Sequence, residues 1–183
     1  MRAITGFFMA WGMFLSIPCP YKKWDESARP YMLCALPFVG LIVGGIWAAV
    51  ALLCQNWPAS VRALALTVTP WLVTGCIHLD GYMDVCDAVL SRRDLATRQK
   101  ILKDAHSGAF AVIGMVLLAL AQWSFFSVEP SQEWPLMLIP VAVRACAGIA
   151  VLRLQPMSTS QYSAMTEKYI VLQCFWQLFY ARR

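Results

Sequence analysis

Apolar residues in this chain gather into blocks of nearly bilayer length, separated by shorter polar stretches. Runs with few or no charges cover residues 31–54, 61–77, 109–128 and 134–154. A helix needs about 20 apolar residues to cross a hydrocarbon core of roughly 30 Å, so each run predicts one membrane-spanning helix. The pattern predicts an all-α, polytopic membrane helix bundle with four full spans, forming a single membrane domain over residues 1–183.

Two shorter apolar pieces flank these spans. Residues 3–19 predict an N-terminal helix that is ended by Pro18 and Pro20. Because no A-x-A cleavage motif follows, we expect it to be retained as a membrane helix or a re-entrant segment rather than removed as a signal peptide. The last apolar piece, residues 169–180, is too short to cross as a helix. In the first full span, Gly40 and Gly44 have GxxxG spacing, which predicts a close contact with a neighbouring helix.

An acidic stretch directly follows the second span. If it is helical, Asp80, Asp84 and Asp87 fall within an arc of roughly 60°, beside an apolar stripe. Like charges at this spacing repel each other, so we expect a divalent cation to compensate them. Carboxylates without thiolate or imidazole partners favour Mg²⁺ or Mn²⁺. The stretch therefore predicts a magnesium site with these three ligands, any of which can also act in catalysis; a solvated acidic face is the alternative.

Other residues near this stretch are candidates for the same chemistry. His78 is a candidate catalytic base or orienting residue, although a lone histidine is more often structural. Asp94 suits the N-cap of a short interfacial helix, and Asp104 is a further catalytic or ligand candidate at the far end of the loop 78–108. Magnesium beside cations favours phosphate chemistry. The substrate-binding candidates are Lys103, Gly108 and the intramembrane Arg144.

A charged side chain at the centre of a bilayer costs free energy, so Arg144 should face the bundle interior and have a partner. Pairing with one of the aspartates and contact with a substrate phosphate are both open to it.

Composition and charge support the membrane interpretation and predict its orientation. Sixty per cent of residues are hydrophobic and 14% are charged, where soluble chains carry about 25% charged residues. With four spans, loops 20–30, 78–108 and 153–168 share one side and hold ten lysines and arginines, whereas the other side holds Arg62 alone. The positive-inside rule therefore places the acidic loop in the cytoplasm, in the cell (inner) membrane of a bacterium or archaeon. The net charge of +5 is explained by topology, so no nucleic-acid partner is expected.

Several motifs resemble those of one known family. His78-Leu79-Asp80-Gly81 is followed by Asp84 and Asp87 in a D-x-x-D pattern. The segment 103–108 is similar to a K/R-D-S-x-x-G element, with alanine in place of the serine, and residues 17–20 match an I-P-x-P pattern. Together with an arginine in a later span, here Arg144, these residues resemble the adenosylcobinamide-GDP ribazoletransferases, also called cobalamin synthases, over about residues 5–155.

The resemblance implies the last assembly step of cobalamin. A hydroxyl of α-ribazole, or of its 5′-phosphate, attacks the cobinamide-side phosphate of adenosylcobinamide-GDP, and GMP leaves. The implied cofactor is Mg²⁺, and the implied partners are these two substrates and the lipid bilayer. Members of the family are generally longer and carry a GGxTGD-type element before their final helices. This sequence ends without it, which predicts a member that is short or truncated at the C terminus.

Two other functions are weighed against this one. The CDP-alcohol phosphatidyltransferases do analogous membrane chemistry, but their D-x-x-D-G-x-x-A-R pattern does not fit, because Asp80-Gly81 is followed by Tyr82-Met83-Asp84, with no Ala-Arg. A non-enzymatic cation-binding or transport protein would need carboxylates inside the spans, whereas the central acids lie in the loop 78–108.

Overall fold

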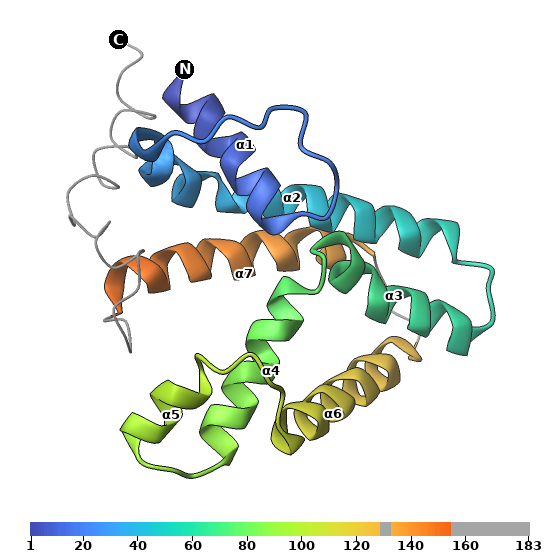
Figure 1. The fold of residues 1–183 in the computed structure, drawn as a ribbon. Coiled ribbons are helices and arrows are strands. Elements are labelled where there is room, and N and C mark those ends of the chain that lie inside the picture. The colour runs from blue at the N-terminus through green and yellow to red at the C-terminus, as the bar shows by residue number, and fades with distance from the viewer. Residues whose placement is uncertain (129–132, 155–183) are drawn as a thin grey trace. The chain divides into compact units, whose positions relative to one another are not determined.

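The computed structural model describes residues 1–128 and 133–154, and in that part of the chain every regular element is a helix (Figure 1). Two compact units form: residues 1–46 with 134–154, and residues 47–128 with Glu133. Each unit has its own packing. The predicted all-α helix bundle is confirmed, and the predicted C-terminal apolar piece, 169–180, lies outside the described residues.

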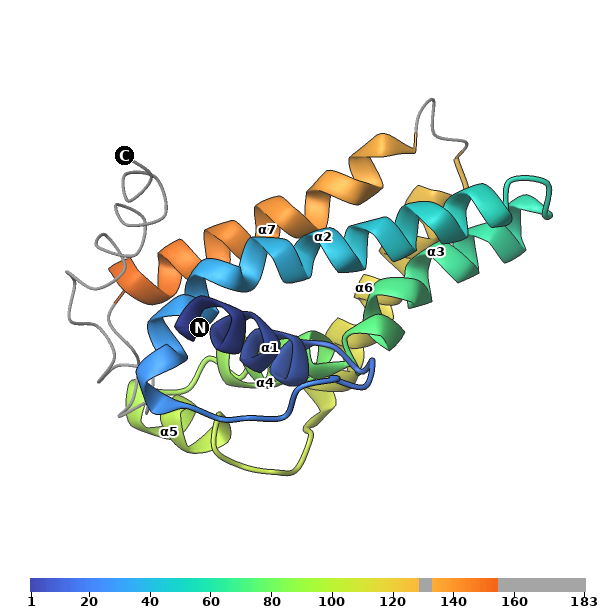
Figure 2. The same ribbon diagram turned by 90° about the horizontal axis from the view of Figure 1, so that it is seen from above.

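Three helices and a short 3₁₀ turn build the first unit: α1 (Arg2–Phe14), η1 (Glu26–Ala28), α2 (Arg29–Leu53) and α7 (Trp134–Arg153). α2 and α7 run antiparallel, side by side, in both views (Figures 1 and 2). A Cβ on Gly40 would come within 2.6 Å of the Pro140 carbonyl oxygen, and one on Gly44 would overlap the Met137 carbonyl. The predicted glycine seam is confirmed, and it lets the two backbones touch.

Alanine at position 44 is expected to destabilise the protein by about 1–3 kcal/mol, because the new methyl group meets rigid backbone rather than a side chain that can rotate. Gly45 is the matched control, since a Cβ there has nothing within 4 Å. Thermal unfolding of the two alanine variants in detergent measures the difference. Equal unfolding temperatures for the two variants would contradict close backbone packing of α2 on α7 at Gly44.

The N-terminal helix is shorter than predicted. It ends at Phe14 rather than Cys19, and Leu15 is already extended, with φ −123° and ψ 140°. Pro18 and Pro20 explain this end, because a proline disfavours helical backbone at the residue before it and cannot donate the helical hydrogen bond. Thirteen residues rise only about 20 Å, short of a full span.

The second unit holds the end of α2 together with α3 (Ala59–Val73), α4 (Ile77–Leu90), α5 (Leu95–Ile101) and α6 (Ala109–Phe126). α6 packs against both α3 and α4, and α5 packs against α4 (Figure 1). The buried Trp47 donates its Nε1–H to the Leu66 carbonyl at 2.8 Å and meets the Phe126 ring edge-on. Trp123 Nε1 donates to the Ser60 carbonyl at 3.1 Å, which holds the end of α6 to the start of α3.

Arg62 lies in the first turn of α3. Its side chain is only 10% exposed and forms an ion pair with Glu133. Removing one partner of this partly buried pair is expected to be destabilising, because the remaining charge loses its counter-ion.

The four predicted spans are confirmed in part. Three described helices are long and apolar enough to cross a membrane: α2 with its preceding 3₁₀ turn, α6 and α7. The predicted span 61–77 is wrong in its bounds, because α3 ends at Val73 and turns by 93° into α4. α3 and α4 reach span length only as this bent pair, so the four full spans are three plus a broken helix.

Candidate active site

A sharp break between α3 and α4 sets the direction of the acidic helix. Gly75 and Cys76 both have φ 60°, in the left-handed region. Thr74 Oγ1 donates to the Pro70 carbonyl at 2.8 Å, and the Cys76 N–H reaches back to the Trp71 carbonyl at 2.8 Å. Two successive left-handed residues cannot continue a right-handed helix, so α4 starts afresh at Ile77 with the acidic motif in its first turns.

Burial of the three aspartates increases along α4. Asp80 is exposed, Asp84 is half-buried and Asp87 is buried, with 9% exposure. The predicted helical spacing is confirmed, so these carboxylates lie on one side of α4 and repel one another. The unit therefore carries a negative helix face that runs from solvent into the packed interior.

Both carboxylate oxygens of Asp87 accept hydrogen bonds from the start of α6. Its Oδ1 accepts the Ala111 N–H at 2.9 Å, and its Oδ2 accepts the Gly108 N–H. The first N–H groups of a helix lack partners within the helix, and a carboxylate there also complements the positive helix terminus. Asp87 thus caps α6 from 21 residues earlier in the sequence, a role that no local pattern predicts. Its predicted metal-ligand role stays a prediction.

Close packing of α4 on α6 holds this cap in place. A Cβ on Gly108 would come within 2.7 Å of Asp87 Oδ1, and one on Gly114 would come within 2.6 Å of Cys86 Sγ. The Tyr82 hydroxyl donates a hydrogen bond to the Gly114 carbonyl at 3.4 Å. Gly108 therefore serves the cap through its own N–H, and its predicted contact with substrate stays a prediction.

The loop before α6 is ordered by Asp104. Its Oδ1 accepts the His106 N–H at 3.0 Å and lies 2.8 Å from His106 Nδ1. The hydrogen bond with the His106 side chain, followed by the one with its backbone N–H, lowers the pKa of Asp104. Asp104 is therefore an ionised, exposed carboxylate in a local turn, beside the exposed Lys103.

Asp94 caps α5, as predicted. Its side chain accepts the Thr97 N–H at 3.2 Å and the Thr97 hydroxyl at 2.7 Å. These two bonds, the side-chain one first, lower the pKa of Asp94. His78 is exposed in the first turn of α4.

Arg144 belongs to the first unit, on α7. It is buried, with 6% exposure, and its guanidinium stands over the Phe14 ring at 5.7 Å from the ring centroid. A cation over an aromatic face is stabilised by the ring quadrupole. The expected interior position is confirmed and the ring is one partner, while pairing with an aspartate of the second unit, and contact with a substrate phosphate, stay predictions.

Within the described ranges, 1–128 and 133–154, no three histidine, cysteine or acidic side chains gather closely enough to hold a metal ion between them. Asp80 and Asp84 accept no hydrogen bond in that part of the chain, so their oxygens are open to a ligand, whereas both Asp87 oxygens are in use. Two open carboxylates on adjacent turns fit Mg²⁺, which is commonly held by one or two carboxylates with waters and substrate phosphates.

Comparison with known proteins identifies a family whose match includes the acidic helix. The family described as cobalamin-5-phosphate synthase matches residues 6–181. The adenosylcobinamide-GDP ribazoletransferase of Clostridium perfringens is 41% identical over 145 residues, which are 76% of this chain and 58% of that relative. The proteins of the same name from Lachnoclostridium phytofermentans and Halalkalibacterium halodurans are each 34% identical, over 84% and 78% of this chain and over 60% and 58% of their own lengths. No solved structure matches the chain.

The chain thus spans under two thirds of the length of these curated relatives. The family match nevertheless runs through the first unit, the acidic helix and the loop 103–108. It confirms the resemblance seen in the HLDG and D-x-x-D motifs: the chain belongs to the cobalamin-5-phosphate synthase family.

Proposed function

We propose that this chain joins α-ribazole, or its 5′-phosphate, to adenosylcobinamide-GDP and releases GMP, the final assembly step of cobalamin. The observation that carries the proposal is the family match over residues 6–181, which includes the acidic helix α4. The relatives' name, adenosylcobinamide-GDP ribazoletransferase, supplies the corrinoid substrate and the ribazole acceptor.

The proposed cofactor is Mg²⁺, held by Asp80 and Asp84. Asp80 is exposed and Asp84 is half-buried one turn later, so the pair stands at the edge of the packed unit where a diphosphate can approach. When bound, the ion neutralises the phosphate oxygens of the leaving nucleotide. Asp87 helps to position Asp80 and Asp84, because its hydrogen bonds to Gly108 and Ala111 hold α4 against α6.

The reaction needs one bond formed and one broken at the cobinamide-side phosphorus. The ribazole hydroxyl oxygen bonds to that phosphorus, and the bond to the GMP oxygen breaks. The hydroxyl proton passes to a carboxylate, for which Asp84 and Asp80 are the candidates on α4 and Asp104 is the candidate in the loop before α6. Lys103 and Arg144 are the proposed cationic contacts for phosphate oxygens, and His78 stays a candidate orienting residue.

The proposed orientation places α4 and the loop 103–108 on the cytoplasmic side. The excess of lysine and arginine in loops 20–30 and 78–108 supports this. Both substrates are then reached from the compartment where nucleotides are made.

Purified chain in detergent, given adenosylcobinamide-GDP, α-ribazole and Mg²⁺, is expected to yield a new corrinoid and an equal amount of GMP by chromatography. The same mixture with a diacylglycerol-type alcohol in place of α-ribazole should yield no GMP. Absence of both products from folded protein would overturn the proposal.

A further inference from the structure

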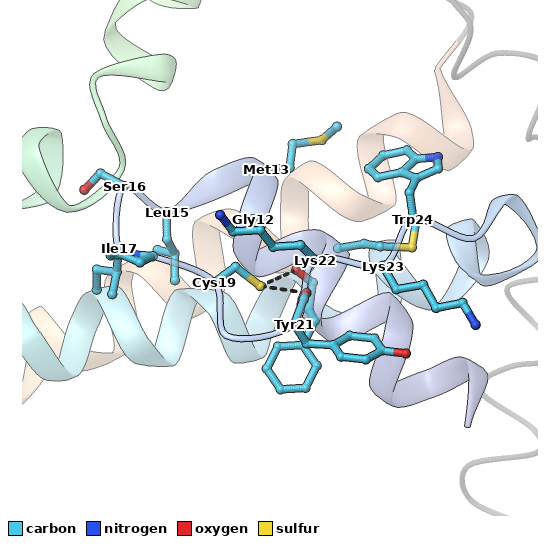
Figure 3. A pocket seen from close by; sticks show the side chains of 13 residues that line it. Gly12, Met13, Leu15, Ser16, Ile17, Cys19, Tyr21, Lys22, Lys23 and Trp24 are labelled. Carbon is cyan, nitrogen blue, oxygen red and sulfur yellow. Dashed lines mark hydrogen bonds between the residues drawn. The ribbon is translucent and has the colours of Figure 1, made fainter.

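A hollow of about 500 Å³ lies in the first unit, between α1 and the segment 15–24 that follows it (Figure 3). Ile17, Pro18 and Cys19 of the I-P-x-P motif line it, and the chemistry of the acidic helix does not use this motif. Small-molecule sites typically measure about 300–1,000 Å³, so its size suits a ligand as large as a mononucleotide and not a corrinoid ring.

The segment around the hollow is held in shape by its own contacts. Trp11 Nε1 donates to the Ile17 carbonyl at 3.0 Å. Cys19 Sγ lies 3.4 Å from the Phe8 carbonyl and 3.1 Å from the Tyr21 carbonyl, so its thiol can donate to either (Figure 3). These bonds fold the turn back onto α1 and leave a preformed site, which lowers the ordering cost of binding.

Two aromatic side chains of the segment 15–24 line the hollow, and in Figure 3 they extend in different directions from the segment. Tyr21 is 41% exposed and Trp24 is 49% exposed. Two contacts fix the Trp24 ring. Its Nε1 donates to Glu26 Oε1 at 2.7 Å, and the Arg29 guanidinium lies over the ring at 5.6 Å from the centroid. An exposed but anchored indole is suited to stacking on a planar base.

A cation completes the lining. Lys22 and Lys23 both line the hollow, but in Figure 3 their side chains diverge. The Lys22 chain extends across the hollow on the side of Gly12, whereas Lys23 extends the opposite way. An ammonium and aromatic rings that line one hollow favour a ligand that combines an aromatic ring with a phosphate.

We propose that this hollow binds a phosphorylated nucleoside, with the base on Trp24 and the phosphate on Lys22. The inference rests on the proposed function for its natural ligand, because both substrates of that reaction carry such a group: the GDP end of the corrinoid, and α-ribazole 5′-phosphate. The lysine-rich segment 20–30 is on the side assigned to the cytoplasm, where both are available.

Calorimetric titration of the purified chain in phosphatidylcholine nanodiscs tests the site with four probes: GMP, α-ribazole 5′-phosphate, guanosine and inorganic phosphate. At least one of the two phosphorylated nucleosides is expected to bind, and which one binds identifies the substrate held here. Guanosine or phosphate alone should bind roughly tenfold more weakly or not at all, since each lacks one of the two contacts.

Matched variants locate the binding. Lys22→Gln is expected to weaken the bound nucleotide roughly tenfold, whereas Lys23→Gln, the same change on the diverging side chain, should leave affinity within about twofold. Gly12→Leu should abolish binding by filling the hollow, because a Cβ at Gly12 has only Cys19 nearby, at 3.7 Å. Circular dichroism and thermal unfolding show whether each variant is folded.

Two results would overturn the proposal. One is nucleotide affinity unchanged in both folded Lys22→Gln and Gly12→Leu. The other is a Lys22 effect confined to nanodiscs with phosphatidylglycerol, which makes the hollow a lipid headgroup site. Failure of the proposed function is distinguishable, because Lys22-dependent nucleotide binding without any corrinoid product refutes the reaction and leaves the site standing.

Discussion

Asparagine at position 84 is expected to lower GMP release from adenosylcobinamide-GDP by roughly 100-fold or more, with little change in thermal unfolding. Asp84 is half-buried on α4 and accepts no hydrogen bond from the described part of the chain, so the fold does not depend on its charge. The reaction does depend on it, since an amide neither holds Mg²⁺ as a carboxylate does nor accepts a proton. Initial rates of GMP release measure the effect.

Asp94→Asn is the matched control. It makes the same chemical change in the same unit, at the N-cap of α5, where asparagine caps about as well as aspartate. Its rate is expected to stay within about twofold of the wild type. Equal rates for the two variants would show that the charge at position 84 has no part in turnover.

Asparagine at position 87 is expected to destabilise the protein by about 1–3 kcal/mol, visible as a lower unfolding temperature. Asp87 accepts the N–H groups of Gly108 and Ala111 with its two oxygens. An amide has one oxygen and one NH₂ group, so one of these donors would face another donor and lose its partner. Hydrogen exchange at residues 108–111 should accelerate in the same variant.

Asp80→Asn is the comparison for this effect, because Asp80 is exposed on the same helix and should change the unfolding temperature little. An Asp87→Asn protein that unfolds like the wild type, with protected amides at the start of α6, would contradict the capping role. Loss of turnover at unchanged stability would instead return Asp87 to the set of metal ligands.

Features encoded locally were predictable from the sequence. Apolar runs long enough to cross a bilayer appear as α2, α6 and α7, and Asp94 before an amphiphilic stretch appears as the cap of α5. Gly40 and Gly44 were predictable as a seam because GxxxG spacing brings both onto one helix face.

The features that sequence reasoning missed depend on contacts between distant residues or on backbone torsion. The break after Val73 lies within an apolar run, where Gly75 and Cys76 give no strong turn signal, so one span was predicted where a bent pair forms. The Asp87 cap joins residues 21 positions apart, and its partners are backbone N–H groups without a side-chain signature. The ring under Arg144 comes from α1, which hydropathy alone does not place against α7.

Turnover of a position-labelled substrate tests the central claim most directly. Adenosylcobinamide-GDP carrying ³²P only in the cobinamide-side phosphate is incubated with the purified chain, α-ribazole and Mg²⁺, and the products are separated. Attack at that phosphorus predicts that all of the label enters the new corrinoid and that the released GMP is unlabelled. Label in GDP or in free phosphate, labelled adenosylcobinamide phosphate in place of a ribazole-containing corrinoid, or no labelled product from folded protein, would contradict the account.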